Sequence, residues 1–378
     1  MTTPGSRNGL HHHRQSAATE RSPFRLGVFT RLVDHVEPAE VYARGLSLLT
    51  TAEELGFDVG WVAQHHVHKE GGLPSPLVFL AYAAARTTRL GLATGIITLP
   101  LEHPLRLAED AAVLDVLSDG RLELGFGTGG NDVVFSIFER QLDNRQADYE
   151  RAFSIVRDAL SGKPLVPDGP ALWPAAEKGL SASIWEAAMS VASASRAGEH
   201  ATRLLLARTA VRSTGALSQA GGLDARQSLG QAQTPLVEAY LAHWSSTEST
   251  PRIGLSRSIY VAETRAEALA DAEAGMRRFA QVAANRPGFS GDLTLEQLLA
   301  TADVHIGSAE DVIASLQADP LLHVASDLIL QVHPVDPSHE QTLRSLRLIA
   351  TEVAPALGWR PGQPAIPPCD ATPRRGES

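Results

Sequence analysis

The chain of 378 residues has a single cysteine, Cys369, so neither a disulfide framework nor a thiolate metal site is available to it. One cysteine suits a reducing compartment, and we predict a cytoplasmic protein. No run approaches the roughly 18 uninterrupted apolar residues of a membrane-spanning helix. The first residues also lack the apolar core of a signal peptide. We therefore expect no membrane partner.

Blocks of like charge are also lacking, although the formal net charge is −10. A protein with this charge pattern has no basic surface for nucleic acid, so we do not expect nucleic acid as a partner. With 43% hydrophobic and 20% charged residues, the composition is that of an ordinary globular protein with a large core.

Three segments have few apolar anchors. Residues 1–23 are polar and include a histidine triplet, which could chelate metal adventitiously, but a disordered tail is the favoured interpretation. Residues 358–378 are rich in proline and predict a second disordered tail. Residues 213–233 are rich in glycine and glutamine and predict a mobile loop. We place the folded unit at 24–357.

The stretch from Arg89 to Gly130 carries the clearest pattern in the chain. Apolar runs at 90–99 and 122–126 are too short for a helix to be the default prediction. Between them, apolar residues recur at nearly 3.6-residue spacing from Pro104 to Gly120. This order is strand, crossover helix, strand, and such a crossover makes the two strands parallel.

The same alternation continues along the whole chain. Strands are predicted at 26–29, 58–63, 90–99, 122–126, 183–189, 204–207, 253–261 and 327–332. Helices fall between them, near 40–55, 75–88, 104–117, 149–160, 235–244, 265–284, 312–318 and 338–357. Eight strands in this order predict an α/β fold, a single (β/α)8 TIM barrel with loop insertions. Ligands of such barrels bind at the carboxyl ends of the strands.

Three segments resemble the bacterial luciferase-like flavin monooxygenases: GFDVGWVAQHH, TGIITLPLEHPLRLAEDAAVLDVLSDGRLELGFGTG and DNRQADYERAF. The pattern LP-x-x-HP-x-R-x-x-ED followed by LD-x-x-S-x-GR is specific to that family. The resemblance is dense from about Phe24 to Arg208 and diffuse beyond. It implies a flavin barrel, reduced FMN as a dissociable cofactor, dioxygen as co-substrate, and a separate flavin reductase as partner. A homodimer is also expected.

The implied reaction is a monooxygenation, in which a C4a-peroxyflavin transfers one oxygen atom to a small organic substrate. Two alternatives stay open. One is an F420-dependent hydride-transfer oxidoreductase on the same barrel, since that cofactor shares the phosphate region. The other is a non-catalytic flavin-binding partner subunit. Uptake of dioxygen with reduced FMN separates the first, and absence of turnover favours the second.

Histidines follow the second predicted strand. The resemblance places His65 beside the flavin, where an imidazole could shuttle a proton. Because adjacent strand residues face opposite sides, at most one of His65 and His66 should point into the barrel mouth. A structural role in the loop and a zinc site with His66 and His68 are the alternatives, the latter without a further ligand nearby. Gln64 stands where the family often has an acid.

The phosphate of FMN is implied at two places. Thr128, Gly129 and Gly130 follow the fourth strand, where bare backbone N–H groups can bind an anion; luciferase itself has an arginine at the position of Thr128. Ser190 and Ser193 match two phosphate-binding hydroxyls at the start of a helix. A tight turn and an ordinary N-cap are the respective alternatives. Arg196 could add charge or face solvent.

The flavin ring is implied at Gly95 and Ile96, where the family has a non-prolyl cis peptide. An ordinary strand glycine is the alternative. Phe29, at the end of the first strand, matches an aromatic residue lining the flavin pocket, and simple barrel core is its alternative.

Overall fold

A computed structural model describes residues 23–33, 36–67, 71–176, 179–209, 227–283 and 293–363. The predicted N-terminal tail up to residue 22, residues 213–226 of the predicted mobile loop, and residues 364–378 of the C-terminal tail lie outside this description.

Ten parallel strands alternate with helices along the chain. The strands are β1 (Arg25–Thr30), β2 (Val59–Val62), β3 (Gly91–Thr94), β4 (Ile97–Thr98), β5 (Leu122–Gly127), β6 (Ile184–Ala188), β7 (Arg203–Leu206), β8 (Ile253–Val261), β9 (Val304–Gly307) and β10 (Asp327–Gln331). The helices are α1 (Pro38–Glu54), α2 (Pro76–Ala84), α3 (Pro104–Leu117), α4 (Asp132–Ile137), α5 (Arg145–Leu160), α6 (Val191–Glu199), α7 (Leu229–Ala242), α8 (Arg265–Ala283), α9 (Leu295–Thr301), α10 (Ala309–Gln317), α11 (His339–Leu348) and α12 (Ala354–Ala356).

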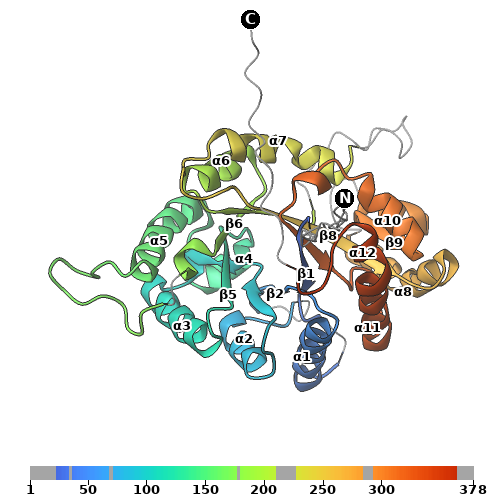
Figure 1. The fold of residues 1–378 in the computed structure, drawn as a ribbon, viewed down its shortest axis with the longest axis horizontal. Coiled ribbons are helices and arrows are strands. Elements are labelled where there is room, and N and C mark those ends of the chain that lie inside the picture. The colour runs from blue at the N-terminus through green and yellow to red at the C-terminus, as the bar shows by residue number, and fades with distance from the viewer. Residues whose placement is uncertain are drawn as a thin grey trace, which may run out of the picture.

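Eight of these strands close into a barrel. Each pairs in parallel with the next in the order β1, β2, β3, β5, β6, β7, β8 and β10, and β10 pairs again with β1. The helices surround this barrel, and the long loop between α5 and β6 projects away from it (Figure 1). The predicted (β/α)8 barrel is confirmed, and each of the eight predicted strand segments contributes one of its strands.

Two cores hold the barrel together. Inward-facing side chains from six of the barrel strands fill the centre; they are Phe29, Val59, Trp61, Ala93, Trp185, Leu205 and Ile329, with Ala63 just after β2. Apolar side chains on the outer faces of the strands pack against the surrounding helices. Within the centre, the rings of Trp61 and Trp185 meet edge to face with centroids 5.4 Å apart. The centre of the barrel is therefore a packed core.

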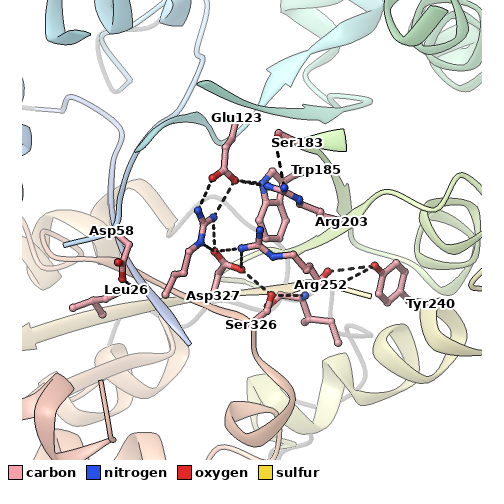
Figure 2. A network of polar contacts seen from close by, with 12 residues as sticks. Leu26, Asp58, Glu123, Ser183, Trp185, Arg203, Tyr240, Arg252, Ser326 and Asp327 are labelled. Carbon is pink, nitrogen blue, oxygen red and sulfur yellow. Dashed lines mark hydrogen bonds and ion pairs between the residues drawn. The ribbon is translucent and has the colours of Figure 1, made fainter. Parts of the chain in front are cut away.

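The amino-terminal end of the barrel is closed by an ion-pair network (Figure 2). Glu123, at the start of β5, binds Arg25 at 2.7 Å and Arg203 at 2.8 Å. Asp327, at the start of β10, binds Arg252 at 2.6 Å and Arg25 at the same distance. Because each partner comes from a different strand or its leading residue, the network joins neighbouring strands and also strands that are not adjacent in the barrel, such as β1 and β5.

Three details differ from the sequence pattern. Helix α7 begins at Leu229 with a capping box formed by Ser228 and Gln231, six residues before the predicted start at Pro235. Residues 229–233, predicted as loop, are thus helical. Strand β9 pairs in parallel with the last residues of β8, outside the closed barrel, and the sequence pattern does not predict it. Beyond the predicted boundary at 357, Trp359 is buried and donates from Nε1 to Asp58 at 2.9 Å.

None of the helices in the described ranges is long and apolar enough to cross a membrane.

Candidate active site at the carboxyl ends of the strands

A cavity of about 390 Å³ opens at the carboxyl ends of the strands, and we call it the rim cavity. Its size lies within the range of small-molecule sites. Seven of the ten residues singled out in the sequence line it: Phe29, Gln64, His65, Gly95, Ile96, Gly129 and Gly130. Thr128, Ser190 and Ser193 lie outside the lining, although Met189, next to Ser190, belongs to it. Segments far apart in the chain thus meet at one rim.

The floor of the rim cavity consists of the Phe29 and Trp61 rings, which we call the aromatic shelf, beside the backbone of Gly95. The Gly95–Ile96 peptide is cis. A Cβ at Gly95 would lie 3.2 Å from the Phe29 ring and 3.4 Å from the Trp61 ring. A Cβ at Gly127 would lie 2.8 Å from the Ile96 side chain, so Ile96 packs tightly on β5. Any larger residue at these glycines would displace the shelf.

Both histidines after β2 line the rim cavity, whereas the sequence pattern predicted that at most one of them would point into the barrel mouth. Strand β2 ends at Val62, so His65 and His66 lie in an irregular loop where side-chain alternation does not apply. The backbone N–H of His65 donates to Leu73 at 2.9 Å, and its ring packs on Gly71. The His66 ring lies 4.6 Å from that of Phe138, and burial lowers the pKa of His66 despite the nearby Glu102.

Gln64 is fixed by both ends of its amide. Its Oε1 accepts from the backbone N–H of Thr98 at 2.7 Å, and its Nε2 donates to Glu102 at 2.8 Å and to the Pro74 carbonyl at 3.3 Å. The side chain is buried. A donor is required toward Glu102 and Pro74, which explains in physical terms why an amide stands here in place of an acid.

The turn after β5 leaves backbone exposed to the rim cavity. Gly129 has φ +67°, and a Cβ there would meet the Thr98 side chain at 2.5 Å. A Cβ at Gly130 would have nothing within 4 Å. The next residue, Asn131, accepts from the N–H of Val134 at 3.2 Å and caps α4. The half-exposed Thr128 has its hydroxyl close to the neighbouring Gly129 carbonyl, 3.5 Å away.

Ser190 and Ser193 form a capping box at the start of α6. Ser190 Oγ accepts from the Ser193 N–H at 3.2 Å, and Ser193 Oγ accepts from the Ser190 N–H at 3.1 Å. The two hydroxyl oxygens lie 3.0 Å apart, at the solvent-exposed edge beside Met189. The arrangement is an N-cap that also presents two hydroxyls at the positive end of a helix.

The Arg196 side chain makes structural contacts and does not contribute to the candidate site. Its guanidinium lies 3.2 Å from Glu150 and 3.4 Å from the fully buried Glu186, and 4.6 Å from the centre of the Tyr149 ring. Neither of the two roles considered from the sequence, added charge at the phosphate or exposure to solvent, matches these contacts. They join α5, β6 and α6 beneath the rim.

Two cations at the rim were missed by sequence reasoning. Arg31 follows β1 and Arg208 follows β7, and both line the rim cavity. Burial and the proximity of Arg31 lower the pKa of Arg208 to about 10. No motif marks either position; only the rule that residues just beyond parallel strands gather at one rim could have found them.

Among the residues that the structure describes, no three His, Cys, Asp or Glu side chains gather to hold a metal ion. His68, the second ligand of the alternative zinc site, lies outside those residues.

The fold and this site define a (β/α)8 barrel with a cavity at the carboxyl ends of its strands. Residues 24–317 match the model of the luciferase-like monooxygenase family, and the chain belongs to that family. Over 122 residues it is 34% identical to the alkanal monooxygenase alpha chain of Photorhabdus luminescens, covering 32% of this chain and 34% of that one. The matches to the curated relatives span less than half of their length.

Solved structures share the whole barrel. Monooxygenase RslO1 from Streptomyces bottropensis is 25% identical, with a TM-score of 0.68 over 88% of this chain and 99% of that one. The oxygenating constituent of 3,6-diketocamphane monooxygenase from Pseudomonas putida, in complex with FMN, is 20% identical with a TM-score of 0.67 over 88% and 98%. The F420-dependent tetrahydromethanopterin reductase from Methanopyrus kandleri is 17% identical with a TM-score of 0.61 over 89% and 99%. The last two likenesses show the fold alone.

Proposed function

We propose that this protein is an FMN-dependent monooxygenase that uses dioxygen to oxygenate a small organic substrate. The observation that carries the proposal is the rim cavity, where seven residues singled out by the family resemblance meet from four separate segments of the chain. A structure of the same fold in complex with FMN supports the choice of cofactor.

The residues present fit a flavin. Phe29, Trp61 and Ile96 give the rim cavity an apolar floor suited to a planar ring, and the bare backbone at Gly129 and Gly130 allows close approach of an anion. Met189 leads from the cavity to the paired hydroxyls at the start of α6. The ring would therefore be held at Gly95 and Ile96, and the phosphate by Ser190, Ser193 and the turn from Thr128 to Gly130.

Reduced FMN, when bound, supplies the electrons that activate dioxygen. The work of the protein is to orient the ring, exclude water and manage a proton. The aromatic shelf excludes water from one face of the site. Gln64 positions the loop at Thr98 through its amide. His65 would hold or move the proton that oxygen transfer requires.

Consumption of dioxygen by the full chain with chemically reduced FMN tests the proposal. Oxygen uptake that ends in an oxygenated organic product supports it. Turnover with reduced F420 and no oxygen uptake would instead assign the F420-dependent hydride transfer that other enzymes of this fold perform. Flavin binding without turnover, with a flavin reductase present, would assign a non-catalytic partner subunit.

We also propose a homodimer, supported by apolar side chains on the exposed faces of two neighbouring helices. Val78 and Tyr82 on α2 and Val113, Val116 and Leu117 on α3 are 43–73% exposed. A second copy of the chain would cover them. Sedimentation of the full chain checks this: Leu117→Glu should shift a dimer to monomer, and a monomeric wild type would contradict the proposal. A flavin reductase as partner and a cytoplasmic location stay predictions.

A further inference from the structure

A second cavity of about 680 Å³ adjoins the rim cavity on the side of β8, β10 and β1, and we call it the side cavity. Arg31, Arg208 and Thr209 line both cavities, so the two share one wall. The side cavity and the rim cavity are thus adjacent. The sequence motifs and the proposed flavin contacts leave the side cavity without a role.

Unpartnered polar groups line the side cavity. Gln331 is fully buried, and neither its Nε2 nor its Oε1 has a hydrogen-bond partner among the described residues. Ser258 is 1% exposed, and its hydroxyl also lacks a partner there. The two residues are direct neighbours in the register between β8 and β10. Because an unsatisfied buried amide or hydroxyl costs about 1–3 kcal/mol, their side-by-side occurrence calls for a ligand that bonds to them.

The charge of the shared wall gives the sign of that ligand. Among the described residues, no acidic side chain pairs with Arg208, and the cation that influences it is Arg31. The two other arginines of the side cavity have their own acids: Arg44 pairs with Glu40 at 2.8 Å, and Arg278 pairs with Asp336. Arg208 thus lines the same cavity as the Gln331 amide and the Ser258 hydroxyl, with no acid among the described residues to pair with it, and these three groups make a donor set for a carboxylate.

We propose that the side cavity binds the carboxylate of an organic-acid substrate, with Arg208, Gln331 and Ser258 as its donors. The rest of the substrate extends across the shared wall into the rim cavity, where its oxidisable carbon meets the cofactor. The Oε1 atom of Gln331 accepts from a hydroxyl or N–H next to the carboxylate. The second part rests on the proposed monooxygenase function; carboxylate binding does not.

Calorimetric titration of the full chain, with and without oxidised FMN, tests the binding with three probes: octanoate, octan-1-ol and inorganic phosphate. Octanoate should bind at least about tenfold more tightly than octan-1-ol in both conditions. Arg208→Gln should weaken octanoate at least about tenfold. Arg44→Gln is the matched control, because its charge is already balanced, and it should change the affinity less than about twofold.

Gln331→Leu separates ligand binding from folding. Replacing an unsatisfied amide by an apolar side chain of similar shape should leave the melting temperature unchanged or raised, and should weaken octanoate at least about fivefold. Its affinity for FMN should match that of the wild type, since Gln331 is absent from the rim-cavity lining. A lowered melting temperature would make the amide structural and overturn the proposal.

Equal affinity for octanoate and octan-1-ol, or phosphate bound as tightly as octanoate, would also overturn it. Octanoate binding without any oxygen uptake would leave the carboxylate site standing and remove the monooxygenase function. The two failures are therefore distinct.

Discussion

The amide of Gln64 shows how one side chain sets the chemistry of this rim. It donates to Glu102 and accepts from Thr98, so an acid at this position would bring two carboxylates into hydrogen-bond distance. Such a pair raises the pKa of one member, because two like charges at this distance cannot both ionise. The departure from the family pattern at Gln64 thus follows from the presence of Glu102.

For Gln64→Glu we expect a stability that depends on pH. The introduced carboxyl has a raised pKa in the folded state, so the loss is small near pH 5 and grows as pH rises through that pKa. By pH 8 it should reach roughly 1–3 kcal/mol in urea denaturation. Gln64→Leu is the control, with a loss that does not vary between the two pH values. A flat difference for both variants would remove the carboxylate-pair explanation.

The two histidines of the rim cavity make a second residue-scale prediction. General acid–base assistance is worth about 10²–10⁴-fold, so His65→Ala should lower product formation by about that factor and raise hydrogen peroxide release. FMN affinity should change far less, because the proposed phosphate contacts are untouched. Turnover and peroxide are measured with reduced FMN. The comparison is His66→Ala, whose ring packs on Phe138. A larger loss in His66→Ala than in His65→Ala would transfer the role to His66.

At the scale of elements, the same two serines cap helix α6 and form the proposed phosphate site. Its first turn is capped by Ser190 and Ser193, whose hydroxyls bond to the backbone and to each other. A phosphate there would take hydrogen bonds from the same hydroxyls and from free N–H groups of the first turn.

The double substitution Ser190→Ala with Ser193→Ala should therefore have two effects. Affinity for reduced FMN should fall at least about tenfold in a flavin titration, because charge-assisted donors are lost. Stability should fall by about 1 kcal/mol, the usual worth of an N-cap. Ser308→Ala, which removes the cap of α10 away from both cavities, is the matched control. It should lower stability alike and leave FMN binding intact; equal loss of affinity in both variants would place the phosphate elsewhere.

The elements of this barrel were largely predictable from the sequence, and the site only in part. Short apolar runs predicted each barrel strand, because a strand that is buried on both faces is apolar along its whole length. The sequence pattern could not predict how His65 and His66 are oriented, since they lie in a loop and side chains outside a strand do not alternate. Pro235 suggested a helix start, but the Ser228 capping box begins α7 earlier. Arg208 and Gln331 carry no motif, and only the closed barrel brings them to one cavity.

At the scale of the whole molecule, the two ends of the barrel differ in how their polar groups are satisfied. At the amino-terminal end, Glu123 and Asp327 are surrounded by guanidiniums and neighbouring hydroxyls (Figure 2). At the carboxyl end, Gln331 and Ser258 have no partners among the described residues. One end thus stabilises the closure of the barrel, and the other retains unsatisfied groups for ligands. This division allows substitutions at the rim to change binding without opening the barrel.

The ion pairs of Glu123 at the amino-terminal end of the barrel lead to a last prediction. Burial alone would raise the pKa of the Glu123 carboxyl, but Arg25 and Arg203 outweigh it and hold that pKa well below its usual range. A depressed pKa contributes stability that is present above the unfolded value of about 4.3 and is lost as pH falls toward the folded value. Glu123→Gln should therefore cost roughly 3–5 kcal/mol at pH 7, because it leaves buried guanidiniums without their acid. As pH falls below about 4 the wild type progressively loses this contribution, so the difference in stability between the two proteins should shrink in urea denaturation. Glu40→Gln, in the exposed pair with Arg44, is the control and should cost less than about 0.5 kcal/mol. A difference for Glu123→Gln that stays constant from pH 7 to pH 3.5 would show that the ion pairs do not hold this end of the barrel together.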